Sequence, residues 1–546
     1  MNRLHAPLFE SLRKLADQRP ASFHVPGHRY GSIFGDDSSS SIEPEKAAFQ
    51  AIMQLDTTEL SATDDLHHPE AAIAEAQQLA AACFGAEETC FLVGGSTSGN
   101  LALLLGVCDP GDIIIVQRNV HKSVINGLKL AGARAVFIMP QIDERTGIAT
   151  LPSLASVSQA LAQYPEAKAV FVTNPNYYGM STRLGPYADF IHAEGKMLLV
   201  DEAHGAHYGF HPLLPESAVG AGADGVVQST HKTLTALTMG AMLHMQGERL
   251  PRAAVRQALA TVQSSSPSFP IMASLDISRA MIERHREGWF EPGIQAAAVF
   301  RNWLAERNPK WLATLHPEDR SSAYDQLDPL RVLITDTTGN HSGFELQRLL
   351  EEQGCWAEMA DPRYVVLVFG IQTTMQDVER LIKACEIIEA RIVNFAVTTP
   401  IMPEAQPKLL PERDANSALV MSSHPIVQGD LKSLQTEIEV QTEVQAKDQT
   451  ENQATEDQPD NLASVQAVTE PISFARTNSI ARVKLAEAAG RCSAEMVVPY
   501  PPGIPVLYAG ERITEASIRQ ISHLAKHGAK FQGASDPSMQ TIEVQE

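Results

Sequence analysis

The sequence has few cysteines and no long uninterrupted apolar stretch. Its six cysteines form no CxxC pair or other metal-ligand spacing, which indicates reduced thiols in a cytoplasmic protein. No stretch approaches the roughly 18 consecutive apolar residues of a membrane span. Residues 1–20 alternate charged residues with leucines, as an amphipathic helix does, and lack the apolar core of a secretion signal. The sequence therefore predicts a cytoplasmic protein without a membrane partner.

Basic residues are outnumbered, with 43 Lys and Arg against 65 Asp and Glu, which gives a net charge of −22. This balance argues against nucleic acid or an acidic membrane as a partner and favours a cationic substrate. A chain of 546 residues with 44% hydrophobic residues can bury a large core and is expected to hold roughly two to four domains.

Residues that commonly bind metals are not grouped in an obvious site. His24 and His28 lie in one loop, and His67 and His68 lie in another, and neither loop supplies a clear third ligand. We therefore expect no metal ion.

Two apolar runs end in chemically active residues. Val226 and Val227 are followed by the string QSTHK, which ends in Lys232, and the run 197–200 is followed by DEAHG, which contains Asp201 and His204. In a parallel α/β sheet the carboxyl ends of strands form the edge at which ligands bind, so these side chains are expected in one cleft. A lone lysine is usually a solvated surface residue and a lone histidine usually structural, so the prediction depends on the combination.

Two further motifs complete this combination. The string GGSTSGN at 94–100 lies between an apolar strand and an apolar helix, where backbone N–H groups and hydroxyls can contact a phosphate at the positive end of the helix dipole. His121, in the string RNVHKS, follows another expected strand. A phosphate cradle, an aromatic lid, a carboxylate and a lysine are the parts needed to hold pyridoxal phosphate, whose aldehyde forms a Schiff base with lysine.

The strings GGSTSGN, HKS, DEAHG and QSTHK resemble those of the Orn/Lys/Arg decarboxylase family, pyridoxal-phosphate enzymes of fold type I, the aspartate-aminotransferase type. The resemblance runs from about Pro26 to Met242 and returns in the string PYPPGIP at 499–505. The string TLTALTMG at 233–240 departs from the longer-studied members, so the chain resembles the shorter branch that lacks an N-terminal wing domain. The resemblance implies decarboxylation of arginine, lysine or ornithine to an amine and carbon dioxide, feeding polyamine metabolism, in a homodimer or higher homo-oligomer.

The resemblance also implies roles for individual residues. Lys232 would bind the cofactor covalently, Asp201 would keep its pyridine nitrogen protonated, and His121 would stack on its ring; these are the candidate catalytic residues. The loop after Thr173 is expected to line the pocket through Asn176 or Tyr177. The remaining candidates for cofactor binding are His204 near the ring and, around the phosphate, Ser96, Thr97, Ser98, Ser229 and His231.

The sequence does not show which residue would recognise the distal cationic group of the substrate. Glu495, beside the string PYPPGIP, is one candidate.

Apolar strands alternate with helices, which predicts an α/β fold whose mostly parallel sheet is covered on both faces. We expect an N-terminal segment plus large cofactor domain at 1–300 and a smaller α+β domain at 301–397. An acidic linker at 398–471 has the composition of a disordered segment. A separate C-terminal domain at 472–546 is expected to begin with a helix at 479–489. The predicted strands of the large domain are 90–93, 112–116, 135–139, 169–173, 196–200, 224–228 and 241–245.

Three other functions fit parts of the pattern. A transamination or aldol cleavage could use the same scaffold, and a catalytically silent sensor could keep the fold while binding amino acids or polyamines. The string DEAH also resembles a helicase box, but the sequence lacks the GxxxxGK[ST] string that would bind a nucleotide.

Overall fold

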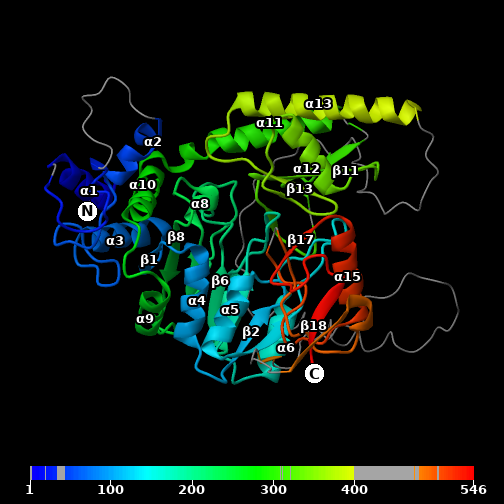
Figure 1. The fold of residues 1–546 in the computed structure, drawn as a ribbon, viewed down its shortest axis with the longest axis horizontal. Helices are drawn as coiled ribbons and strands as arrows, with labels where there is room; N and C mark the ends of the chain where they lie inside the picture. The colour runs from blue at the N-terminus through cyan, green and yellow to red at the C-terminus, as the bar shows by residue number, and fades with distance from the viewer. Residues whose placement is uncertain are drawn as a thin grey trace, which may run out of the picture. The chain divides into compact units, whose positions relative to one another are not determined.

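The fold is described from a computed structural model of the chain (Figure 1). Apart from Thr398, the predicted linker at 398–471 lies outside the residues that the structure describes. In the described part of the chain, no helix is both long and apolar enough to span a membrane. The described residues are 3–18, 20–32, 44–307, 309, 311–319, 321–398, 472–473, 479–500 and 503–546.

An eight-stranded sheet with the order β1-β8-β7-β6-β4-β2-β3-β14 forms the centre of the large domain. The four pairings among β7, β6, β4, β2 and β3 are parallel, and β1, β8 and β14 join the two edges antiparallel, so the predicted mostly parallel α/β sheet is confirmed. The strands are β1 (Glu88–Leu92), β2 (Ile113–Gln117), β3 (Arg134–Ile138), β4 (Ala169–Thr173), β6 (Met197–Asp201), β7 (Gly225–Gln228), β8 (Ala241–Met245) and β14 (Ile472–Ser473).

Helices cover both faces of this sheet because alternate strand residues point to opposite sides. Ile114 and Leu199 pack under α4, α5 and α9, whereas Ile115 and Leu198 pack under α6 and α7. Figure 1 shows α4 and α5 side by side across the strands. The helices of this domain and the N-terminal segment are α1 (Pro7–Asp17), α2 (Pro44–Met53), α3 (Ala72–Phe84), α4 (Gly95–Val107), α5 (Lys122–Ala131), α6 (Leu154–Gln163), α7 (Gly185–Ala193), α8 (Thr230–Thr233), α9 (Arg252–Val262) and α10 (Phe269–His285).

Close packing of α4 on the sheet depends on a glycine in its second turn. A Cβ atom at Gly99 would lie 2.8 Å from Leu92 and 2.9 Å from Val227. A larger residue would force the helix away from the strands. The string GGSTSGN therefore sets how closely the start of α4 approaches the ends of β1 and β7.

The smaller domain contains a four-stranded sheet with the order β12-β13-β11-β9, all of whose pairings are antiparallel. Figure 1 shows α11 and α13 side by side. A 3-10 turn at Arg286–Trp289 separates α10 from α11. The elements are α11 (Glu291–Arg307), β9 (Leu312–Thr314), β11 (Arg331–Asp336), α12 (Gly343–Glu352), β12 (Met359–Ala360), β13 (Val365–Val368) and α13 (Met375–Thr398), and a two-stranded sheet pairs β5 (Met180–Ser181) with β10 (Gln326–Leu327).

The helix predicted at 479–489 is wrong. The chain forms a strand there, β15 (Ile480–Lys484), which pairs antiparallel with β18 (Thr541–Gln545). Ala481 and Val483 alternate with charged residues and pack against the core that contains Ile542, a period of two that a strand satisfies. The remaining elements of this region are a 3-10 turn at Leu485–Glu487, β16 (Val498–Tyr500), α15 (Glu515–Lys526) and β17 (Lys530–Gln532).

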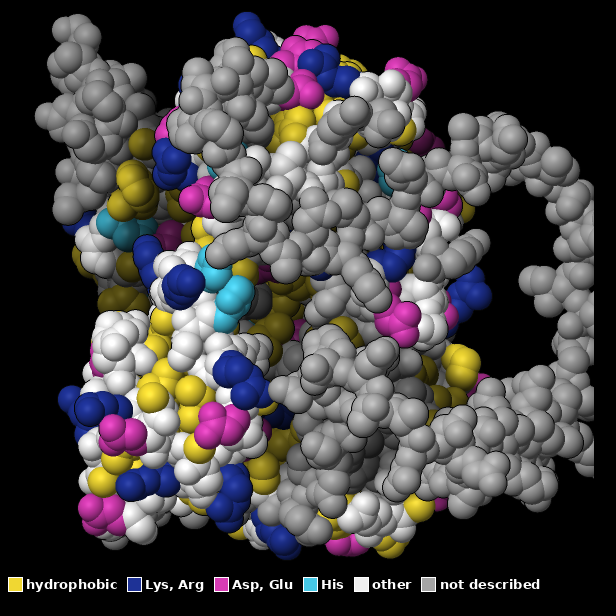
Figure 2. Space-filling view, turned by 90° about the vertical axis from the view of Figure 1, so that its right-hand side faces the viewer, with side chains coloured by type: hydrophobic (Ala, Val, Ile, Leu, Met, Phe, Trp, Pro, Cys, Tyr) yellow, Lys and Arg dark blue, Asp and Glu magenta, His cyan; other side chains and the backbone are white. Residues whose placement is uncertain are grey.

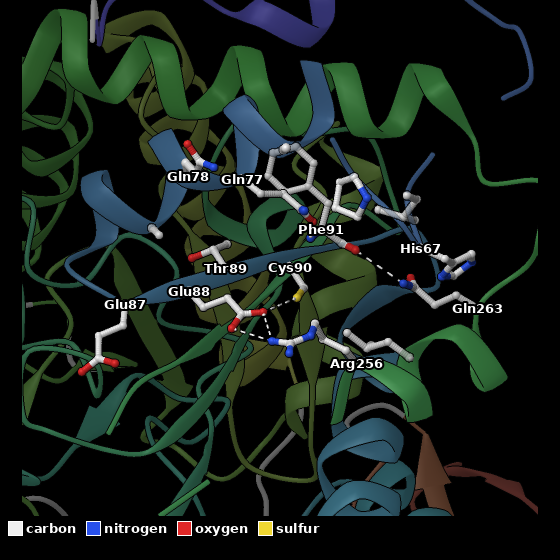
Figure 3. A pocket seen from close by; sticks show the side chains of 15 residues that line it. His67, Gln77, Gln78, Glu87, Glu88, Thr89, Cys90, Phe91, Arg256 and Gln263 are labelled. Carbon is white, nitrogen blue, oxygen red and sulfur yellow. Dashed lines mark hydrogen bonds and ion pairs between the residues drawn. The ribbon is translucent and has the colours of Figure 1, made fainter. Parts of the chain in front are cut away.

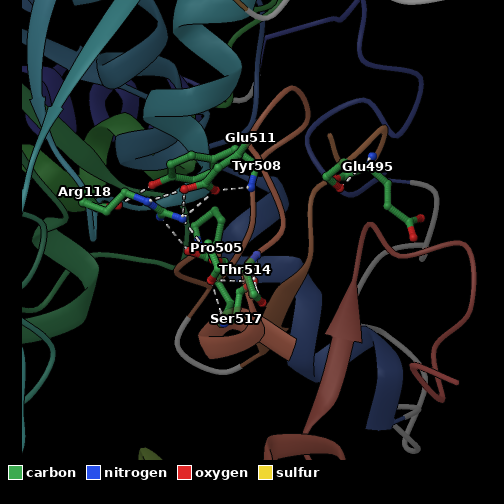
Figure 4. A network of polar contacts seen from close by, with 9 residues as sticks. Arg118, Glu495, Pro505, Tyr508, Glu511, Thr514 and Ser517 are labelled. Carbon is green, nitrogen blue, oxygen red and sulfur yellow. Dashed lines mark hydrogen bonds and ion pairs between the residues drawn. The ribbon is translucent and has the colours of Figure 1, made fainter. Parts of the chain in front are cut away.

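Arg118, in the loop after β2, ties the C-terminal residues to the large domain (Figure 4). Its guanidinium donates two hydrogen bonds to the Glu511 carboxylate through Nη2 and one each to the carbonyls of Pro505 and Val506. The same group lies 3.8 Å from the centroid of the Tyr508 ring, whose hydroxyl donates to the Arg118 carbonyl. This set of contacts holds the segment after Gly503 near the start of α5.

Candidate functional site

Asp201 ends β6 and lies where three parallel strands finish. It pairs in register with Thr173 of β4 and Val227 of β7. The side chain of Asn100, from α4, donates hydrogen bonds to Asp201 Oδ2 at 2.8 Å and to Ser123 Oγ at 2.9 Å. Asp201 Oδ1 accepts from the backbone N–H of residue 203 at 3.1 Å. The carboxylate is therefore buried and fixed at both oxygens.

Lys232 lies in α8, the single helical turn after β7, and its amine approaches His204. Nζ of Lys232 is 2.9 Å from Nε2 of His204 and 5.7 Å from the centroid of the Tyr177 ring. The rings of Tyr177 and His204 contact each other, with centroids 4.4 Å apart. Burial lowers the pKa of the Lys232 amine, although the Asp201 carboxylate acts in the opposite direction. The structure thus brings together three predicted site residues, and their roles remain predictions.

His204 contacts a second cation through its other ring nitrogen. Nη2 of Arg331 lies 3.2 Å from Nδ1 of His204, and Arg331 is 2% exposed at the start of β11. Burial, followed by the charges of Lys232 and Arg331, holds the pKa of His204 well below its usual value. The imidazole is therefore neutral.

His121 is the N-cap of α5 and lies against the C-terminal segment. Its Nδ1 accepts from the Ser123 backbone N–H at 3.2 Å and lies 2.8 Å from Ser123 Oγ. Gly503 is so close that a Cβ atom there would lie 3.2 Å from Nε2 and Cδ2 of the ring. Burial lowers the pKa of His121 to about 4, against the opposing charge of Asp201. A neutral ring with one edge fixed by Ser123 can stack on a planar ligand.

The predicted phosphate contacts lie at the start of α4 and around α8, and they differ in what they already bind. Ser229 Oγ donates to Ser96 Oγ at 2.9 Å, which joins the two segments. Ser98 is buried and its hydroxyl donates to the carbonyl of residue 95, while His231 Nδ1 lies 3.0 Å from the carbonyl of residue 240. Thr97 is exposed. Ser96 and Thr97 are therefore better placed than Ser98, Ser229 or His231 to contact an anion with their side chains.

Comparison with known proteins decides the family. Residues 6–377 match the family model described as Orn/Lys/Arg decarboxylase, major domain, and residues 449–540 match that of the C-terminal domain. The chain belongs to the Orn/Lys/Arg decarboxylase family. The family resemblance in the sequence is confirmed.

Members of this family align over almost the whole chain. The chain is 36% identical to the uncharacterized protein YaaO of Bacillus subtilis over 97% of this chain and 96% of that protein. It is 30% identical to an arginine decarboxylase of the same organism, over 100% of this chain and 98% of the relative. It is 25% identical to the lysine decarboxylase LdcA of Pseudomonas aeruginosa, over 95% of this chain and 75% of that protein.

Solved structures support the same fold. The lysine decarboxylase LdcF of Francisella novicida superposes with a TM-score of 0.72 at 19% identity, covering 100% of this chain and 81% of that one. For the lysine decarboxylase A of Pseudomonas aeruginosa the TM-score is 0.73 at 22% identity, with coverage of 99% and 80%. The fold expected for an Orn/Lys/Arg decarboxylase, including the separate C-terminal region, is thus confirmed.

In this decarboxylase-family chain, the sequence alone does not single out Asn100, Arg331 or Gly503. Asn100 closes the string GGSTSGN, and Gly503 lies within PYPPGIP, so a closer look at each string could find both. The only signal for Arg331 is a charged residue at the head of the apolar string RVLIT.

Glu495 is bound within the C-terminal segment, and its role as the residue that recognises the distal cationic group stays a prediction. Its two carboxylate oxygens accept hydrogen bonds from the backbone N–H groups of Ser535 and Glu543, at 2.6 and 2.9 Å. Figure 4 shows it apart from the contacts of Arg118. Glu495 therefore stabilises the C-terminal segment, because both of its carboxylate oxygens accept from the backbone of that segment.

A cavity of about 220 Å³ lies away from Lys232, between α3, β1 and α9 (Figure 3). Glu88 and Arg256 form an ion pair on its wall with N–O distances of 2.8 Å. The side chains of Gln77 and Gln263 accept hydrogen bonds from backbone N–H groups at the end of β1. These contacts cover the free edge of the sheet, and the predicted site residues do not line the cavity.

The face of the molecule in Figure 2 shows no patch of purely acidic or purely basic side chains. Acidic and basic side chains of the described residues are interspersed there with hydrophobic ones. Among the residues that the structure describes, no group of three or more His, Cys, Asp or Glu could hold a metal ion.

Proposed function

We propose that this chain is a pyridoxal-phosphate-dependent decarboxylase of a basic L-amino acid: arginine, lysine or ornithine. Its membership of the family supports the reaction class. The observation that carries the proposal is the half-buried Lys232 amine beside His204, on the strand edge that also presents the buried Asp201 carboxylate.

The donors and acceptors of the site fit pyridoxal phosphate. Two buried side-chain oxygens, Asn100 Oδ1 and Thr230 Oγ1, have no hydrogen-bond partner among the described residues. The first lies beside the carboxylate and the second beside the lysine turn. Ser96 adds a hydroxyl at the positive end of α4, where it accepts a hydrogen bond from Ser229, and this suits a phosphate.

Each residue then has a task that its placement supports. When bound, pyridoxal phosphate supplies an aldehyde for a lysine and a pyridinium ring that accepts electrons. Lys232 would hold the aldehyde carbon through its amine, and the fixed Asp201 carboxylate would favour a proton on the ring nitrogen. His121 would lie against the ring, and its Nε2 would be the atom suited to exchange a proton near the substrate.

A cationic substrate suits the charges around the site. Relatives named arginine decarboxylase are 28% to 30% identical over the full chain. Glu358 is an exposed residue just before β12. Burial lowers the pKa of His231 and of Lys232, and the negative charge of Glu358 acts in the opposite direction on both, so this charge acts on the site. We also propose, from the fold type, a homodimer or larger homo-oligomer in the cytoplasm whose amine product enters polyamine metabolism.

The test is product analysis with arginine, lysine and ornithine in parallel, using the cofactor-loaded chain and Lys232→Ala. We expect carbon dioxide and the matching amine in equal amounts from at least one amino acid, and none from Lys232→Ala. A keto acid in place of carbon dioxide would favour a transaminase, and cofactor binding without any product would favour a sensor.

A further inference from the structure

A continuous series of five polar side chains starts at Lys232, and its other four members are buried, two from the loop after β6 and two from the start of the small domain's β11 region. Lys232 Nζ lies 2.9 Å from His204 Nε2, and His204 Nδ1 lies 3.2 Å from Arg331 Nη2. Arg331 Nε lies 3.9 Å from the Asp328 carboxylate, which accepts a hydrogen bond from His207 Nε2 at 2.9 Å. Residues 204 and 207 follow β6, whereas residues 328 and 331 precede or begin β11.

The hydrogen-bond donors in this series of side chains determine which nitrogen of His204 carries the hydrogen. A guanidinium has only N–H donors and stays protonated in proteins, so Arg331 donates to His204 and Nδ1 must accept. In a neutral imidazole the other nitrogen then carries the hydrogen, so Nε2–H points at Lys232 Nζ. An ammonium has no lone pair with which to accept that hydrogen bond, whereas a neutral amine has one.

We propose that Arg331 is a positioning residue that fixes the tautomer of His204 and thereby keeps the Lys232 amine neutral. The inference rests on the proposed function, because only there does Lys232 need a free lone pair. The neutral amine is the form that attacks an aldehyde carbon. In this account, a residue of the small domain controls the reactivity of the lysine in the large domain.

Arg331 is held in place from several sides. Asp328 Oδ1 accepts from the backbone N–H of residue 330 at 2.9 Å, so the carboxylate beside the guanidinium is itself fixed. The stem of Arg331 packs against Gly179, where a Cβ atom would lie 2.6 Å from Arg331 Cγ. This lack of space leaves the guanidinium little freedom to turn away from His204.

The other charges around Lys232 act in both directions. The carboxylates of Asp201 and Glu358 favour the ammonium, whereas burial and the Arg331 guanidinium favour the amine. His121 and His231 also lie within electrostatic range of the lysine, and burial lowers the pKa of both. Without the hydrogen bond from His204, the carboxylates of Asp201 and Glu358 would raise the pKa of Lys232, and its amine would be protonated more readily.

The experiment measures the protonation of Lys232 in the full chain after removal of any cofactor. Trace acetic anhydride is applied across a pH series, and the labelled fraction of each lysine is read by mass spectrometry. We expect Lys232 to label with a midpoint below those of exposed lysines. In Arg331→Met the midpoint should rise by about one pH unit or more, a roughly tenfold loss of neutral amine at pH 7. Arg331→Lys, which keeps a cationic donor, should restore part of the shift.

A matched control comes from Arg301, another buried arginine of the small domain, whose guanidinium donates, within the described residues, to the backbone carbonyls of residues 315, 329 and 331. Arg301→Met disturbs the same region without touching His204, so the Lys232 midpoint should not move. An equal rise in Arg301→Met would show that loosening of the small domain is responsible and would overturn the proposal.

A double-mutant cycle separates the hydrogen-bond route from a direct effect of charge. His204→Leu should raise the midpoint even though Arg331 is present, and adding Arg331→Met should then change it little. If Arg331→Met has its full effect without His204, the relay through the histidine is wrong. The labelling needs neither cofactor nor substrate, so failure of the decarboxylase assignment would leave this result readable.

Discussion

Replacing Gly503 with alanine tests whether the C-terminal segment shapes the site. Gly503 has φ +89, a left-handed conformation that costs a residue with a Cβ atom about 1–2 kcal/mol. The added Cβ would lie 3.2 Å from His121, so the ring must move by a few tenths of an ångström. Since misplacement of a catalytic group by about 1 Å can cost about a hundredfold in rate, we expect kcat to fall by roughly three- to tenfold.

Gly528 provides the matched control for this prediction. Its φ of +86 carries the same backbone cost, but a Cβ atom there would meet nothing within 4 Å. Both alanine variants should lose about 1–2 kcal/mol of unfolding free energy in urea, and only Gly503→Ala should lose kcat for amine formation. Equal kcat in the two variants would refute a contact between Gly503 and a working His121.

Three other predictions follow from buried or charged groups outside the reacting atoms. Burial raises the pKa of Glu202 to about 8, above its value in the unfolded chain. The contribution of Glu202 to the free energy of unfolding is therefore complete below about pH 4.5 and is lost as the pH rises through 8. Urea unfolding should therefore show Glu202→Gln losing less stability than the original chain between about pH 5 and 8, and parallel losses would contradict the shift. Arg118→Met breaks a pair whose side chains are 14% and 22% exposed and should cost about 3 kcal/mol of unfolding free energy, whereas Arg307→Met, at more exposed pairs that solvent screens, should cost much less. Glu358→Gln should raise KM for the basic amino acid by about threefold with little change in kcat; an unchanged KM would remove Glu358 from substrate attraction.

The large domain could be predicted from the sequence because its signals are local. Each apolar strand is short and continuous, and the parallel-sheet rule then brings the end of β6 to the end of β7. Asp201 and the Lys232 turn therefore lie on one edge without any knowledge of distant contacts. The glycine-rich string likewise lies at the start of α4, as its pattern indicates.

The contacts that tune the site could not be predicted in this way. His204 and Arg331 lie 127 positions apart and meet through the packing of two sheets, for which the sequence carries no local signal. Ser98 and His231 carry suitable chemistry, but both bind carbonyls of the protein itself. The strand at Ile480–Lys484 was mistaken for a helix because five residues of alternation are too short to exclude a helical period.

The central claim is that Lys232 is the lysine that holds pyridoxal phosphate. Borohydride reduction of the cofactor-loaded chain, followed by digestion and peptide mass spectrometry, tests it directly. We expect the mass of a reduced pyridoxyl phosphate on the peptide that contains Lys232, and no such mass in Lys232→Ala. A modification on another lysine, or none on a chain that still forms amine, would contradict the account.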